Sequence, residues 1–70
     1  MKYLKQEHLD TLEQIKIDAV ALFNDEGLDL EEYSSDLSSE VISNFRMEYP
    51  NFDYMDEDFC EELFDKAYIE

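Results

Sequence analysis

Apolar residues recur at steps of three and four along the first third of the chain, which is the spacing of an amphipathic α-helix. The stripe consists of Leu9, Leu12, Ile15, Ala19, Leu22 and Phe23. Asn24 and Gly27 supply stop signals after it. Thr11 and Gln14 fit a capping box that would start the helix at residue 12. Because Leu4 continues the stripe, we favour the earlier start and predict a helix over residues 5–24.

Two further helices are predicted from the same spacing. After a connector at residues 28–35, with Ser34, Ser35 or Asp36 expected as the N-cap, four apolar residues follow at four-residue steps. They are Leu37, Val41, Phe45 and Tyr49. Pro50 ends this pattern, so the second helix is expected over residues 36–49.

The third helix is expected over residues 54–68, capped by Asp53 or Asp56. Its buried residues would be Met55, Phe59, Leu63 and Ala67, with Phe64 at the edge. No stretch shows the sustained alternation of a β-strand. The sequence therefore predicts an all-α, three-helix single domain that spans residues 1–70.

Composition supports a folded chain in spite of its charge. Of 70 residues, 44% are apolar and 14% aromatic, with one Gly and one Pro, whereas disordered chains are poor in aromatics and rich in Pro and Gly. The single cysteine cannot form an internal disulfide, and no apolar run is long enough for a signal sequence or a membrane helix. We therefore expect a cytoplasmic protein that does not contact a membrane.

The net charge is −15, and it is unevenly distributed. Residues 1–24 hold three Lys and four acids, whereas residues 25–70 hold 16 acids against Arg46 and Lys66. This charge opposes direct binding to nucleic acid, because the phosphates would repel it. It also exceeds the magnitude of about 2–8 that solubility requires of a small domain. The excess favours a partner with a basic surface.

Catalytic and metal chemistry have little support in the sequence. His8 is the only histidine and is expected as a partly exposed residue at the edge of the first stripe, and Cys60 as a half-buried structural cysteine among acids that blunt its reactivity. The acidic loop around Gly27 fails as a calcium loop, because Leu22 and Tyr33 would occupy ligand positions. We expect no enzyme activity, no cofactor and no metal site.

One short motif is similar to that of a known family. Asp36-Leu37-Ser38 at the start of the second helix resembles, in permuted order, the Asp-Ser-Leu motif of acyl carrier proteins, which are also small, acidic and helical. The resemblance implies a modifiable serine at Ser38 or Ser39. The chain departs from the family in the residue order and in the missing glycine before the motif.

The acids of the third helix favour a different function. Asp58, Glu61, Glu62 and Asp65 stand at i, i+3, i+4 and i+7 and so form one strip, with Glu57 at its border. Two interleaved rows of such carboxylates place a charge about every 3 Å, close to the roughly 3.4 Å per phosphate of one DNA strand. We therefore predict a non-enzymatic inhibitor that mimics nucleic acid and blocks the basic groove of a nuclease or another nucleic-acid-binding protein. In size and composition the chain is similar to small acidic proteins with which phages and mobile elements oppose host defences.

The expected partner-binding residues are the connector acids, the acids of the third helix and two tyrosines. They are Asp29, Glu31, Glu32, Asp36, Tyr49, Tyr54, Glu57, Asp58, Glu61, Glu62 and Asp65. The main alternative is an antitoxin or immunity-type protein that neutralises one basic partner through aromatic anchors such as Tyr49 and Tyr54. An oligomerising adaptor is a further alternative, and the sequence leaves a monomer or a dimer open.

Overall fold

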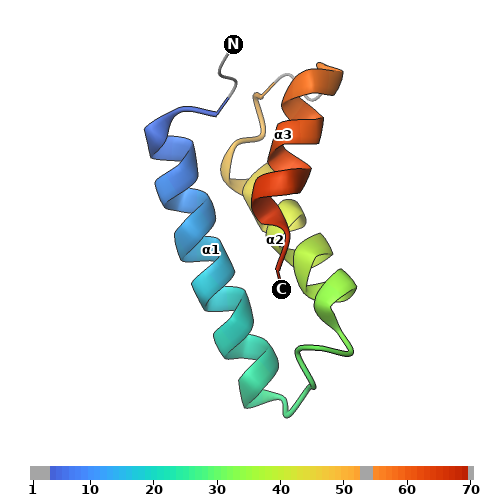
Figure 1. Cartoon of the computed structure of the whole chain (residues 1–70). Helices are drawn as coiled ribbons and strands as arrows, with labels where there is room; N and C mark the ends of the chain where they lie inside the picture. The colour runs from blue at the N-terminus through green and yellow to red at the C-terminus, as the bar shows by residue number, and fades with distance from the viewer. Residues whose placement is uncertain (1–3, 53–54, 70) are drawn as a thin grey trace.

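Three helices make up the described part of the chain, which in this computed structural model is residues 4–52 and 55–69 (Figure 1). α1 spans Gln6–Asp25, α2 spans Ser34–Glu48 and α3 spans Glu57–Ala67. α2 runs antiparallel to α1, and the shorter α3 turns back beside α2. No strand occurs in the described residues, so the predicted all-α, three-helix fold is confirmed.

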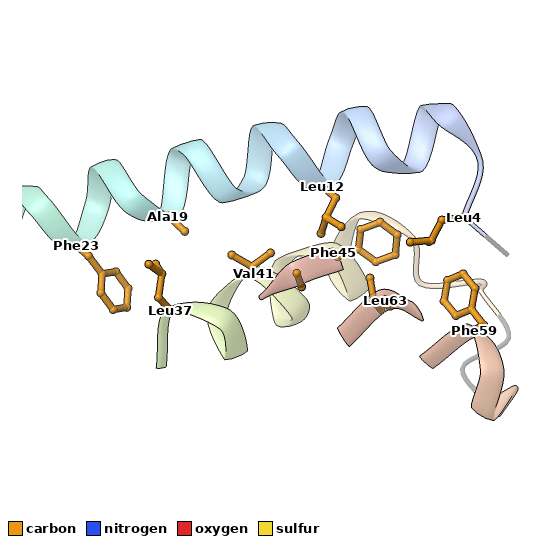
Figure 2. Close-up of a cluster of buried hydrophobic side chains, with 10 residues drawn as sticks. Leu4, Leu12, Ala19, Phe23, Leu37, Val41, Phe45, Phe59 and Leu63 are labelled. Carbon is orange, nitrogen blue, oxygen red and sulfur yellow. The ribbon is translucent and has the colours of Figure 1, made fainter. Parts of the chain in front are cut away.

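The core lies where the apolar stripes of the three helices meet (Figure 2). α2 contributes its centre, because Leu37, Val41 and Phe45 are fully buried. The residues that pack around this centre are Leu4, Leu12, Ala19, Phe23, Phe59, Leu63 and Ala67. Most of the apolar positions that the three- and four-residue spacing predicts are thus buried.

Two residues expected in the core are exposed instead. Leu22 is 49% exposed, because it precedes the buried Phe23 by one residue and one residue turns a helix by about 100°. Met55 is 89% exposed, because α3 begins only at Glu57 and Met55 lies outside the helical period. The predicted start of α3 at residue 54 was therefore too early.

The starts of α2 and α3 follow different rules. The α2 N-cap is Tyr33, which has no side-chain capping bond, so the prediction of Ser34, Ser35 or Asp36 as the cap was wrong. The preceding turn replaces it: Tyr33 donates its backbone N–H to the Asp29 carbonyl at 2.9 Å and accepts from the Leu37 N–H at 2.8 Å. α3 has the predicted Asp56 cap, whose Oδ1 accepts from the N–H groups of Asp58 and Phe59 at 3.0 and 3.2 Å. Asp53, the other cap considered, lies outside the described residues.

His8 is buried, at 6% exposure, and not partly exposed as its sequence position indicated. The segment after α2 folds over the start of α1, so the rings of Tyr49 and Phe52 lie edge-on to the imidazole, with centroids 4.8 and 4.7 Å away. His8 Nδ1 accepts a hydrogen bond from the Lys5 N–H at 3.1 Å. The imidazole therefore helps to fix the first turn of α1 and closes one end of the core.

Candidate functional site

The acidic strip is defined here as Asp58, Glu61, Glu62 and Asp65 on α3. α3 turns Phe59, Leu63 and Ala67 into the core, and this leaves Asp58, Glu61 and Asp65 exposed on the opposite side. Glu62 is half-buried at the border of the strip. The helix therefore brings the four predicted acids onto one face.

The centre of the strip has no neutralising cation among the described residues. The carboxylates of Glu61 and Asp65 form no hydrogen bond or ion pair with any residue in 4–52 or 55–69. Lys66, although adjacent in sequence, forms no ion pair with a described residue, and its backbone carbonyl accepts from Lys16 Nζ at 3.3 Å. Both carboxylates are thus available to an outside donor.

The connector acids form a separate acidic region. Asp29, Glu31 and Glu32 are exposed in the turn before α2, and Asp36 is exposed in the first turn of α2. This connection lies at the end of the molecule opposite the start of α3 (Figure 1). Asp29 also has a local role, because its Oδ1 accepts from the Glu31 N–H at 3.0 Å. The structure therefore does not join the connector acids to the start of the acidic strip.

Of the two tyrosines expected as anchors, only Tyr49 lies among the described residues. Tyr49 is half-buried, its hydroxyl lies 2.9 Å from Thr11 Oγ1, and its ring packs against Phe45 at a centroid distance of 4.9 Å. Tyr49 is thus part of the contact between α1 and α2. Tyr54 lies outside the described residues.

Exposed aromatic rings occur instead on and just after α3. Phe64 is 58% exposed and Tyr68 is 51% exposed. The sequence predicts Phe64 at the edge of the core, and Tyr68 is one of five aromatic residues that are not easily all buried in so small a domain. The signal was present in the spacing, because Phe64 is one residue from Leu63 and so points about 100° away from the buried stripe.

The serine of the carrier-protein resemblance is engaged internally. Ser38 is buried, and its Oγ accepts from the Ile69 N–H at 3.1 Å. Attachment of a prosthetic arm there would require the residues after α3 to leave their place. Ser39, the other serine considered, is exposed.

A metal-binding cluster and a membrane-spanning helix are both absent from the described residues. Cys60 is half-buried, as expected. In the part of the chain that the structure describes, no three His, Cys, Asp or Glu side chains are grouped so that they could hold a metal ion. None of the described helices has the length and apolar character needed to cross a bilayer.

Comparisons of the chain with protein-family models, curated proteins and solved structures find no match. The strip can accept charge-assisted hydrogen bonds from Arg or Lys, which are roughly twice as strong as neutral ones.

Proposed function

We propose that the protein binds a basic, nucleic-acid-binding groove of another protein and blocks it by presenting the acidic strip in place of phosphates. The observation that supports this most directly is the exposed pair Glu61 and Asp65. These two carboxylates stand four residues apart on one helix. Neither forms an ion pair with a Lys, Arg or His side chain in the part of the chain that the structure describes. Like charges at this spacing oppose helix formation, so the helix itself gains nothing from them.

The electrostatics of the whole chain favour the same partner. A net charge of −15 on a body measuring 38 × 18 × 17 Å produces a field that attracts a cationic surface and raises the rate of encounter. At the surface of the partner, Glu61 and Asp65 would each accept hydrogen bonds from Arg or Lys, as phosphate oxygens do. Salt screens such contacts, so the affinity should fall steeply as ionic strength rises.

The test is capture from a host lysate with three forms of the chain. These are the wild type, the strip variant Glu61→Gln with Asp65→Asn, and a control variant Asp25→Asn with Glu26→Gln. The control makes the same change in net charge at exposed residues at the end of α1. Captured proteins are then challenged with an excess of DNA or RNA oligonucleotides.

We expect the wild type and the control to retain nucleic-acid-binding proteins that oligonucleotides displace, and the strip variant to lose them. A captured protein that stays bound to the chain in excess oligonucleotide does not use its nucleic-acid groove for this contact. That result would reject the proposal that the chain mimics nucleic acid. Equal capture by the strip variant and the wild type would show that the acidic strip is not part of the interface.

The exposed rings on the same part of the chain favour a second candidate, the immunity-type protein. Aromatic anchors dominate many protein interfaces, and Phe64 is exposed one residue before Asp65. If Phe64→Ala abolishes capture and the strip variant does not, the partner is recognised mainly by shape. Tyr49→Ala does not make this distinction, because Tyr49 belongs to the fold.

A further inference from the structure

A groove lies between α1 and the C-terminal segment, defined here as Tyr68 and Ile69. It has a volume of about 380 Å³ and opens to solvent. Its lining is Glu13, Lys16, Ile17, Val20, Tyr68 and Ile69. Ile17 is 54% exposed, so two large side chains on opposite walls, Ile17 and Tyr68, present apolar surface to water.

Hydrogen bonds to two helices hold the C-terminal wall in place. The Ile69 N–H donates to the buried Ser38 Oγ of α2, and Lys16 Nζ of α1 donates to the Lys66 carbonyl at the end of α3. A cation at that carbonyl is also favoured by the negative end of the helix. The groove is therefore formed before any partner arrives, which lowers the ordering cost of binding.

Charge decides which kind of molecule can cover the groove. A second copy of the chain would bring another −15 against this surface, and like charges across an interface cost affinity. Of the two charged groups in the lining, the Lys16 amine is directed to the Lys66 carbonyl, whereas Glu13 is exposed. A segment that carries Lys or Arg beside an apolar side chain fits both the negative charge of the protein and the apolar lining of the groove.

We infer that this groove receives a leucine-sized apolar side chain from a cationic segment of the partner protein. The inference rests on the proposed function in one respect, the basic character of the partner. It adds a short-range contact to the long-range attraction of the acidic strip. The two regions follow one another along the chain, because Asp65 precedes Tyr68 by three residues.

Two synthetic peptides of about 12 residues test this inference. Both carry the same number of lysines; one has two leucines four residues apart, and the other has serines in their place. Binding is followed by amide chemical shifts of the full chain and by isothermal titration. We expect the leucine peptide to bind about tenfold more tightly, the size expected for part-burial of a leucine, and to shift the amides of Ile17, Val20 and Ile69.

Two chain variants locate the effect. Ile17→Gln should remove the tenfold advantage of the leucine peptide, whereas Leu22→Gln should keep it. Leu22 is the matched control, because it lies on the same helix at 49% exposure but outside the groove. Since both positions are half exposed, both variants should retain the circular dichroism of the wild type. If Ile17→Gln unfolds, Tyr68→Ala serves as the second groove variant.

The outcomes separate this inference from the proposed function. Equal affinities for the two peptides, or a leucine advantage that survives Ile17→Gln, would overturn the inference that the groove receives an apolar side chain. Neither result contradicts salt-sensitive binding through the acidic strip. A leucine advantage that Ile17→Gln removes, together with affinities that neither salt nor the strip variant changes, would support the groove and reject the mimic. A dimer that Ile17→Gln converts to a monomer would show a second copy as the occupant and overturn the inference.

Discussion

Neutralising the centre of the acidic strip should make the protein more stable. Glu61 stands three or four residues from Glu57, Asp58 and Asp65, and Asp65 stands three residues from Glu62. Each such like-charge pair on a helix costs roughly 0.2–0.5 kcal/mol, so the four pairs together cost about 1–2 kcal/mol at low ionic strength. The strip variant, Glu61→Gln with Asp65→Asn, removes all four without changing side-chain shape.

The gain is measurable by thermal unfolding followed at 222 nm. For a domain of 60–100 residues, about 1 kcal/mol shifts Tm by roughly 4–8 °C, so we expect a rise of at least about 4 °C near 0.01 M salt. At about 1 M salt the Debye length falls to about 3 Å, shorter than the roughly 5–6 Å between the paired side chains. The advantage over the wild type should therefore largely disappear there.

The control variant, Asp25→Asn with Glu26→Gln, isolates the pair repulsion. It makes the same change in net charge, also near the C-terminal end of a helix, but neither residue has an acid three or four positions before it. We expect its Tm to rise by less than that of the strip variant. An unchanged or lower Tm for the strip variant at low salt would refute the reasoning, because the carboxylates would then contribute to the fold. In that case their presence on α3 would need no partner to explain it.

The remaining predictions concern the fold. Phe45→Ala removes a fully buried ring and should cost about 3–5 kcal/mol, a large part of the stability of so small a domain, and urea unfolding should show the loss. Asp56→Ala should cost about 0.5–2 kcal/mol in the same assay, whereas Asp56→Ser retains a cap and should recover most of it. Thr11→Val and Tyr49→Phe should each cost about 0.5–1.5 kcal/mol, and their combination should cost little more than either alone, because one hydrogen bond joins them. Additive costs in that cycle would mean that the hydroxyls do not interact.

The helices and most of the core could be predicted because they depend on short-range periodicity. Leu12, Val41 and Leu63 each repeat at three- or four-residue steps with other apolar residues, and all three are buried. The boundary of α3 depended on a choice between two aspartates, and the periodic pattern alone did not decide between them. Met55 entered the predicted core because it lies four residues before Phe59, a spacing that does not show where the helix begins.

His8 and Tyr49 show what periodicity cannot predict. Their positions depend on the segment after α2, which folds across the start of α1 and brings together residues more than thirty positions apart, such as Thr11 and Tyr49. Such contacts leave no local pattern in the sequence. Tyr49 was expected both in the apolar pattern of the second helix and at an interface, and its hydroxyl is bonded to Thr11 within the protein.

The acidic strip was predictable because its members share one helix, but the groove was not. Ile17 and Tyr68 are fifty-one positions apart in sequence, and only the packing of the C-terminal segment against α1 makes them neighbours. Exposure of Ile17 follows from its place on α1, beyond the stripe that Leu12 and Ala19 define. Sequence reasoning therefore found the charged part of the proposed interface and missed the apolar part.

These two parts would act at different stages of binding. The field of the strip extends over roughly a Debye length, so it governs encounter and its effect falls with salt. The groove acts only at contact and depends on apolar area, which salt does not screen. A partner that uses both should keep a slow dissociation rate at high salt even as its association rate falls. If Ile17→Gln changed the association rate and the strip variant changed only dissociation, this division of roles would be wrong.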